Sequence, residues 1–192
     1  MMKHKIVKFL LLNSFVIIAN AANIAYIPKA APGDTAAAGV GKEWPNPRFM
    51  VDVTGECVID NLTGLMWSRS GNLLETGSWG TSSEDGTAQK LVAQMNTNPD
   101  ATGYHLCGYS DWRLPNQNEL LSLFNYSAPN HDQAAWLNNT EIFSNVQSSS
   151  YWSSTPHTGN VGAWYVDMAT GMSTWHSDLS GSYYVWPVRG GR

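Results

Sequence analysis

The residue types best suited to recognising a ligand are gathered in the last third of the chain, in two short stretches rich in Gly, Ser and Thr. These stretches are 156–162 (PHTGNVG) and 173–182 (STWHSDLSGS). An indole face can stack on a sugar ring or a peptide, and imidazole, amide and carboxylate groups can then hydrogen-bond the same ligand. Loops between strands commonly carry such side chains. The candidate ligand-binding residues are therefore His157, Asn160, Trp175, His176 and Asp178.

Trp175 also admits a structural interpretation, because aromatic side chains fill cores as readily as they form interfaces. It could be a strand residue packed on Trp164 or Trp186. The sequence leaves these two interpretations open.

A catalytic interpretation of the same region depends on Ser153, His157, His176 and Asp178, which provide the residue types of a nucleophile, a base and an orienting acid. The Gly-x-Ser-x-Gly turn that exposes the nucleophile of many hydrolases is absent. Geometry rather than residue type defines such sites. We therefore expect no catalytic residue and a non-enzymatic protein.

Oxygen ligands for a metal ion occur in loops, among them Asp100, Asn130 and Asp132, but they follow no EF-hand pattern. Residues of these types more often form turns and helix caps. We assign no metal ligand and no cofactor, and a structural calcium ion stays an open alternative.

The first 21 residues are typical of a secretory signal peptide. Lysines at the start precede an apolar stretch, 9–19, and Ala19-Asn20-Ala21 offers a cleavage site. The apolar stretch is too short and too interrupted to predict a membrane span. We expect an exported protein, in the periplasm, at the cell surface or secreted, with no stable membrane span after cleavage.

Residues 22–43, rich in Ala, Gly and Pro, are predicted to form a flexible arm, and 44–192 a single domain.

The charge of the mature chain excludes some partners. The whole chain has 11 basic and 15 acidic residues, and the signal peptide removes three lysines and no acid, so the mature net charge is about −7. An acidic protein without a Lys/Arg cluster is poorly suited to nucleic acid or to highly sulfated polysaccharide. The sequence does not predict the oligomeric state.

Cys57 and Cys107 are the two cysteines of the chain. An even number in an exported protein indicates a disulfide, which here would close a loop of roughly 50 residues. The alternatives are two free thiols, a metal pair or a catalytic pair. The chain has no C-x-x-C spacing, and its histidines and cysteines do not follow the spacing of a zinc site. We predict the disulfide.

The scaffold for the candidate residues is organised around 108–124 (GYSDWRLPNQNELLSLF). Asn116 and Glu119 have the spacing of a capping box, so a helix is predicted to start here. Asp111 and Arg113 lie two residues apart and can share a face of the preceding extended segment. We predict that they form a half-buried ion pair or clamps that fix the turn, while Trp112 fills the core beneath them.

The remaining patterns predict an α+β fold. Alternation predicts strands at 48–53, 57–59, 65–67, 151–155, 163–168, 172–175 and 183–189. A further helix is predicted from Thr87, with an apolar stripe of Ala88, Leu91, Val92 and Met95. The stretches 70–86 and 125–150 are predicted loops. Pro187 cannot donate to a ladder and predicts an edge or a bulge.

Five blocks occur in an order that resembles the Lcl C-terminal domain family, named for a collagen-like bacterial adhesin. They are DNLTGLMW (60–67), GYSDWRLPNQNELLSL (108–123), YWSST (151–155), AWYVDMATG (163–171) and YVWPVRGG (184–191). The family is similar in fold to C-type lectin-like domains and formylglycine-generating enzymes. The resemblance implies two helices packed on an irregular antiparallel sheet, with the terminal strands close together. Tryptophans within these blocks are predicted to be core residues: Trp67, Trp112, Trp152 and Trp164.

The resemblance implies an exported module for ligand binding or adhesion, with a surface glycan or a protein as partner. The alternative is a structural component of a bacterial surface assembly. A formylglycine-generating activity would need a close cysteine pair near the end of the chain, and neither cysteine lies in the last third.

Overall fold

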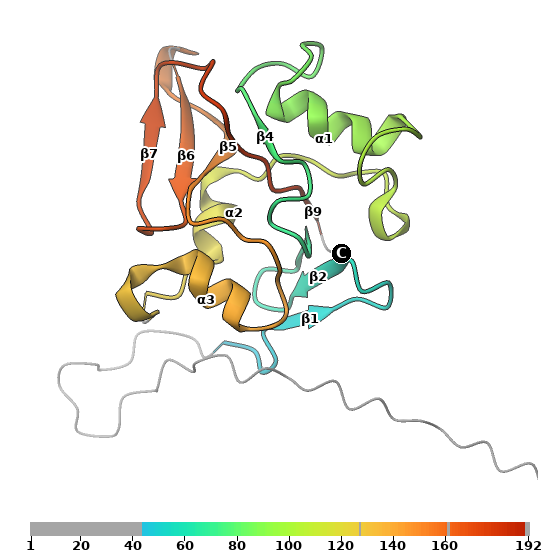
Figure 1. The fold of residues 1–192 in the computed structure, drawn as a ribbon, viewed down its shortest axis with the longest axis vertical. Helices are drawn as coiled ribbons and strands as arrows, with labels where there is room; N and C mark the ends of the chain where they lie inside the picture. Colours follow the sequence, from blue (N-terminus) through green and yellow to red (C-terminus); the bar gives the residue numbers. More distant parts are fainter. Residues whose placement is uncertain (1–43, 127, 161, 191–192) are drawn as a thin grey trace, which may run out of the picture.

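The computed structural model describes residues 44–126, 128–160 and 162–190 (Figure 1). The predicted signal peptide and arm, 1–43, lie outside these residues. The fold is α+β, as predicted, with two sheets and three α-helices among the described residues. None of the helices in this part of the chain is long and apolar enough to cross a membrane.

The first sheet has the strand order β1-β2-β3-β9 and is antiparallel throughout. Its strands are β1 (Phe49–Val51), β2 (Cys57–Asp60), β3 (Leu65–Ser68) and β9 (Val188–Gly190). The predicted hairpin is confirmed, and the amide of Asp52 donates to the carbonyl of Cys57 at 2.9 Å where the turn begins. Strands from both ends of the described domain thus share one sheet.

The second sheet has the strand order β4-β8-β5-β6-β7, with one parallel pair, β5 and β8. Its strands are β4 (Thr76–Gly77), β8 (Tyr183–Tyr184), β5 (Ser150–Pro156), β6 (Ala163–Asp167) and β7 (Ser173–His176). The predicted strands at 151–155, 163–168 and 172–175 are confirmed, but the loop prediction for 70–86 missed β4. This strand is only two residues long, too short to show alternation.

The predicted strand at 183–189 is two strands that belong to different sheets. Tyr184 pairs with Thr76 and Tyr151 in the second sheet, whereas Val188 pairs with Trp67 in the first. Pro187 lies in the crossing between them, and its carbonyl accepts from the amide of Ser68 at 3.2 Å. A proline fits here because its missing N–H interrupts no ladder.

The helices are α1 (Ala88–Thr97), α2 (Gln117–Ser122) and α3 (Gln133–Asn139), with short 3₁₀ turns at Leu106–Gly108, Pro129–His131 and Thr158–Asn160. Thr87 caps α1 and Asn116 caps α2, as predicted. The expectation of only two helices and a loop over 125–150 is wrong, because Asp132 caps α3 through the amide of Ala135. This short helix is stabilised mainly by the burial of Trp136 and Leu137.

The core of the domain is aromatic. The ring of Trp186 lies 5.4–5.5 Å from those of Trp67, Phe143 and Tyr151. All four residues are buried, and the indole N–H of Trp186 donates to the carbonyl of Ser68 at 2.9 Å. Such pairs contribute about 0.5–1.5 kcal/mol each beyond the burial of their area. The crossing between the sheets is therefore also the centre of the core.

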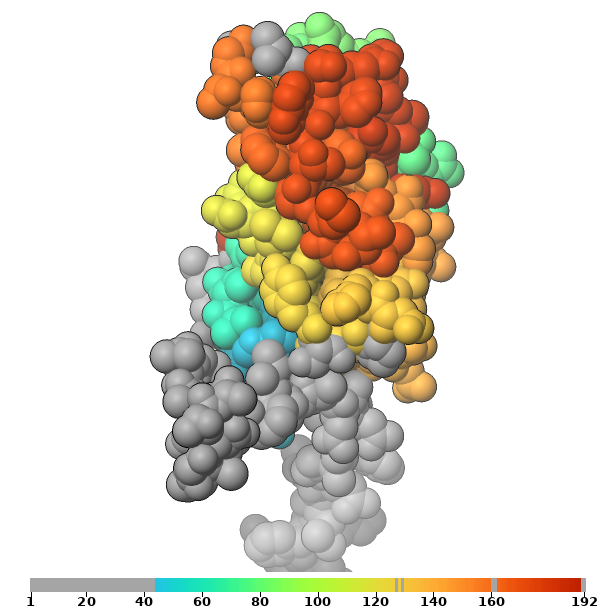
Figure 2. Space-filling model, turned by 90° about the vertical axis from the view of Figure 1, so that its left-hand side faces the viewer, coloured from blue at the N-terminus to red at the C-terminus, as the bar shows by residue number. Residues whose placement is uncertain are grey.

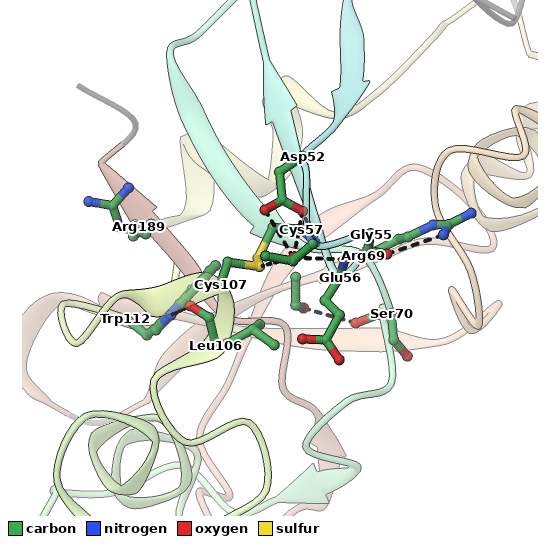
Figure 3. The surroundings of a disulfide bond; sticks show 12 residues. Asp52, Gly55, Glu56, Cys57, Arg69, Ser70, Leu106, Cys107, Trp112 and Arg189 are labelled. Atoms are coloured by element: carbon green, nitrogen blue, oxygen red, sulfur yellow. Dashed lines mark hydrogen bonds between the residues drawn. A yellow bond between two sulfur atoms is a disulfide. The ribbon is translucent and has the colours of Figure 1, made fainter. Parts of the chain in front are cut away.

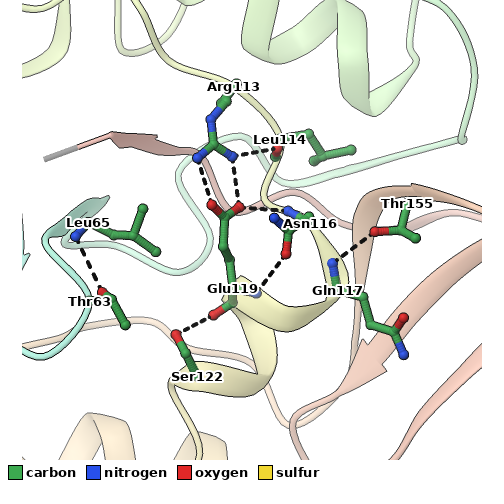
Figure 4. Close-up of polar contacts among 9 residues, drawn as sticks. All are labelled: Thr63, Leu65, Arg113, Leu114, Asn116, Gln117, Glu119, Ser122 and Thr155. Carbon is green, nitrogen blue, oxygen red and sulfur yellow. Dashed lines mark hydrogen bonds and ion pairs between the residues drawn. The ribbon is translucent and has the colours of Figure 1, made fainter.

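The predicted ion pair between Asp111 and Arg113 does not form. Arg113 pairs with Glu119 at 2.7 Å, and Asp111 pairs with Arg189 of β9 at 2.6 Å. The backbone of Arg113 bridges to Val188, and this places Asp111 beside β9 instead. Trp112 is buried in the core, as predicted. The stretch is therefore clamped at two places, to β9 and to α2, as Figure 4 shows for the pair with Glu119.

Candidate functional site

An aromatic surface formed by His157, Trp164 and Trp175 lies on one face of the second sheet. Trp164 of β6 is directly opposite Trp175 of β7 in the antiparallel register. Val166 lies two residues beyond Trp164 on the same face and is fully buried. The same face of the sheet therefore carries the buried Val166 and, at the end of the strands, the aromatic surface.

His157 completes the aromatic surface from the end of β5. Its imidazole stacks on the indole of Trp175, with ring centroids 4.0 Å apart and planes 17° apart, and lies 6.2 Å from the ring of Trp164. Trp175 nevertheless keeps 40% of its surface exposed. The stacking holds one indole face in place while the remainder is available for a ligand.

Glycine is required where the chain returns from His157 to β6. The amide of His157 donates to the carbonyl of Gly162 at 2.8 Å. A Cβ built on Gly162 would lie 2.4 Å from the carbonyl oxygen of His176 and 2.9 Å from the ring of Trp175. Only glycine lets the backbone approach β7 this closely.

Helix α2 supports the same face of the sheet. Gln117 donates from its backbone to Thr155 Oγ1 at 3.0 Å (Figure 4). Its side chain donates to Ser173 Oγ at 2.9 Å. The amide of Ser154 donates to the carbonyl of Pro115 at 2.7 Å. Figure 2, viewed from the β7 side, shows the red residues of the C-terminal third reaching the surface beside the yellow residues of the α2 region. The aromatic surface thus lies on the same face of the sheet as a capped helix that is bonded to β5 and β7.

His176 lies on the opposite face of β7 from Trp175, because successive residues of a strand alternate. Its ring lies 6.3 Å from that of Tyr183 in an edge-to-face arrangement. The backbone N–H of Asp178 donates to Nδ1 of His176 at 3.0 Å. The carbonyl of Asp178 also lies 3.0 Å from Nδ1, so the ring is held against the backbone of this turn.

The carboxylate of Asp178 accepts hydrogen bonds within its own turn. Its Oδ1 accepts from the hydroxyl of Ser180 at 2.5 Å and from the amide of Ser180 at 3.0 Å. The hydroxyl and then the amide of Ser180 lower the pKa of this carboxyl below its usual range. Asp178 stays fully ionised at neutral pH and stabilises the loop after β7.

The predicted ligand-binding set is therefore divided between two places. His157 and Trp175 are brought together, whereas His176 and Asp178 lie with Tyr183 on the other face. The side chain of Asn160 lies outside the described part of the chain. Trp164, predicted as a core residue, is half-buried and belongs to the aromatic surface instead. The two interpretations of Trp175 both hold in part, since it is a strand residue opposite Trp164 and is also exposed.

The residue types of a hydrolytic triad are present but do not form one among the described residues. The hydroxyl of Ser153 is buried and donates to the carbonyl of Trp164 at 2.7 Å. His176 contacts the backbone of Asp178 and not its carboxylate. Neither contact provides the serine–histidine or histidine–carboxylate bond that a triad requires.

The predicted disulfide joins Cys57 of β2 to Cys107, with Cα atoms 6.4 Å apart (Figure 3). Thr54 Oγ1 lies 3.2 Å from the sulfur of Cys107, and Asp52 accepts from Thr54 and from the amide of Cys57. Within the described residues, the one His/Cys/Asp/Glu cluster close enough to share an ion is Asp52, Cys57 and Cys107. Since both sulfurs are bonded to each other, neither is a thiolate ligand.

The sequence did not predict a groove that lies beside α1, away from the aromatic surface. Its lining includes Leu91 and Gln94 of α1, Asp100 in the following turn, and Glu75 from the opposite wall. The apolar stripe predicts Leu91 as a core residue, but it is half-buried and lines this groove. The sequence holds no local signal for it, because the facing wall is contributed by a predicted loop.

Comparison with known proteins places the chain in a family. A search of curated proteins found no match. The family model described as the Lcl C-terminal domain matches residues 56–189, well over half of the chain. This range contains β2 to β8, the disulfide, the aromatic surface and most of β9. The chain belongs to the Lcl C-terminal domain family.

Proposed function

We propose that the protein is an exported, non-enzymatic binding module of the bacterial envelope, and that its aromatic surface contacts a glycan or a protein. The family is consistent with an adhesin-like surface module. The disulfide is consistent with folding in an oxidising compartment. The signal peptide, the periplasmic, cell-surface or secreted location, and the C-type lectin-like arrangement are parts of the same proposal.

The observation that carries the proposal is the ordered and exposed indole of Trp175. Its stacking on His157 restricts the side chain before any ligand arrives. A rigid aromatic side chain loses little conformational entropy on binding, so more of its contact energy is available as affinity. Trp164 lies directly across the strand pair and extends the surface.

The proposal that no enzymatic activity is present has two supports. The cysteines are bonded to each other and far from the last strands in sequence. The hydroxyl of Ser153 is buried and donates its hydrogen bond to the carbonyl of Trp164. Neither group is in the state that a nucleophile needs.

A glycan array with residues 22–192, produced with the disulfide formed, tests the proposal. We expect binding to neutral or weakly acidic glycans, and loss of most of that binding in Trp175→Ala. The matched control is Tyr126→Ala, because Tyr126 is 70% exposed and contacts Phe124 edge to face, outside the aromatic surface. Equal binding by both variants would place the contact elsewhere. Absence of binding at high micromolar concentration would remove the glycan version and leave a protein ligand.

The second candidate is a structural part of a surface assembly. It is favoured by the position of β7, which is the outer strand of the second sheet in the described part of the chain. An outer strand can pair with a strand of another molecule. Sedimentation velocity at two concentrations tests this candidate, because self-assembly raises the sedimentation coefficient with concentration. A clean monomer at both concentrations argues against assembly of this chain with itself.

A further inference from the structure

A half-open groove of about 510 Å³ lies between α1 and the segment Leu73–Glu75. Its volume falls within the range of small-molecule sites in proteins. One wall is a face of α1 and its C-cap, formed by Leu91, Gln94 and Asn98. The other lining residues are Asp100, Ala101 and Thr102 in the turn that follows. The groove shares no residue with the aromatic surface.

The walls of the groove are fixed by contacts outside it. The amide of Val185, in the crossing between the sheets, donates to the carbonyl of Glu75 at 3.0 Å. Gly103 has φ +71°, and a Cβ there would lie 3.0 Å from Met95 Cε and 3.1 Å from Leu73 Cδ2. Glycine therefore allows the turn after α1 to close on Leu73. The groove is a built feature of the fold.

The polar chemistry of the groove is acidic. Glu75 and Asp100 both line it, and no Lys, Arg or His does. Among the described residues, neither carboxylate takes part in a hydrogen bond or an ion pair. Asp100 bonds through its backbone to Asn98 Oδ1, and Glu75 through its backbone carbonyl. Both carboxylates are therefore available to a cation.

The apolar chemistry of the groove is aliphatic. Leu73, Leu74 and Leu91 line it, and no aromatic ring does. The groove offers no aromatic ring on which a sugar could stack, whereas a methylene chain can lie along the leucines. A chain that ends in a cation would match both the apolar lining and the two carboxylates.

We infer that this groove binds an aliphatic primary ammonium group, with its methylene stem against Leu73 and Leu91 and its ammonium beside Glu75 and Asp100. Two sources share this chemistry: a free diamine or polyamine, and a lysine side chain of another protein. The site is independent of the aromatic surface, so the inference does not rest on the proposed function.

Amide chemical shifts of the ¹⁵N-labelled protein test the inference. The probes are 1,5-diaminopentane, Nα-acetyl-lysine amide and the neutral 1,5-pentanediol. We expect both amines to shift the amides of Gln94, Ala101 and Thr102, with dissociation constants on the order of 1 mM, and the diol to have little effect. Tighter binding of the lysine derivative would assign the site to a protein, and tighter binding of the diamine to a free amine. Equal shifts by the diol and the amines, or shifts confined to other regions, would overturn the inference.

Charge-removing variants separate the groove from a general acidic surface. Glu75→Gln and Asp100→Asn should each weaken amine binding about threefold or more, because each removes one carboxylate without changing the side-chain shape. Glu75 has φ +58°, and glutamine at this position keeps the same backbone conformation and strain. Asp85→Asn is the matched control, since Asp85 is exposed and lies outside the groove. Equal weakening by all three variants would reduce the effect to net charge and refute the site.

Discussion

The imidazole of His157 stacks on the indole of Trp175, with the ring centroids 4.0 Å apart. The two residues come from the end of β5 and from β7, with β6 between these strands in the sheet. The pair thus covers the end of β6, the middle one of these three strands. It connects the stability of this edge of the sheet to the order of the proposed binding surface.

His157→Ala should lower the free energy of unfolding by about 0.5–1.5 kcal/mol, the usual contribution of an aromatic pair. It should also weaken ligand binding, because Trp175 loses the ring that restricts it. Urea unfolding and the glycan array measure the two effects. The neighbouring Thr158→Ala, at an exposed position, is the control and should change neither. A fully stable His157→Ala protein would show that the stacking contributes nothing to the fold.

Glu119 should make stability depend on pH in the acid range. Burial opposes ionisation of this carboxyl, but Arg113 and the amide of Asn116 lower its pKa below its ordinary value of 4.5. A carboxyl with a lowered pKa in the folded state contributes stability that is fully present above the unfolded pKa. That contribution is lost as the pH falls through the folded pKa. Arg189 lowers the pKa of Asp111 in the same direction.

Two variants separate the two roles of Glu119, the ion pair with Arg113 and the capping box. Glu119→Gln keeps a side chain that can complete the capping box but removes the ion pair with Arg113, and should cost about 0.2–1 kcal/mol at pH 7. Glu119→Ala removes both interactions and should cost about 1–2 kcal/mol. Urea unfolding at pH 7 and pH 3 measures the effects. The difference between Glu119→Gln and the parent protein should shrink at pH 3, and a constant difference would contradict the charge argument.

Loss of the disulfide should destabilise the protein strongly. The bond closes a loop with a sequence separation of 50 residues. A loop of this size corresponds to about 4 kcal/mol of chain entropy in the unfolded state. Denaturant unfolding with and without reductant measures the effect, and mass spectrometry after alkylation counts the free thiols. The double variant Cys57→Ser/Cys107→Ser should match the reduced protein. Two alkylatable thiols in the untreated protein would disprove the bond.

Trp112→Ala should unfold the domain or bring it close to unfolding. Trp112 is 3% exposed, and its indole N–H donates to the carbonyl of Leu106 at 3.2 Å. Substitution of a buried tryptophan by alanine costs about 3–5 kcal/mol, a large part of the stability of a typical domain. Near-UV circular dichroism reports the loss of fixed aromatic packing. Trp175→Ala is the control and should keep a folded spectrum, whereas a folded Trp112→Ala protein would remove Trp112 from its structural role.

Local patterns were enough to predict the elements that carry their own signals. The capping residues Thr87 and Asn116, and the alternation in the first hairpin, act over a few residues and were correct. Helix α3 was not predicted because 125–150 is mostly polar, and its few apolar residues are isolated and show no helical period. Its cap, Asp132, lies in a stretch whose polar composition predicts a loop.

The contacts that define the candidate site are non-local and could not be predicted in the same way. Asp111 pairs with a residue 78 positions away, so its nearer neighbour Arg113 was the only visible partner in the sequence. The stacking of His157 on Trp175 depends on the order of three strands in the sheet. The separation of Trp175 from His176 follows from strand alternation alone. The Gly/Ser-rich composition of 173–182 instead predicts a ligand-binding loop, in which Trp175 and His176 could share a face.

The crossing at Val185–Pro187 has a consequence for biosynthesis. β8 lies inside the second sheet, between β4 and β5, and β9 completes the first. A nascent chain that ends before Tyr183 therefore lacks a part of both sheets and has no Trp186 around which to pack the core. Pairing between β3 and β9 spans most of the domain, and contacts of such long range form slowly. The domain should thus stay unfolded until its last strand has been synthesised, the condition in which a chain can be threaded through a translocation channel.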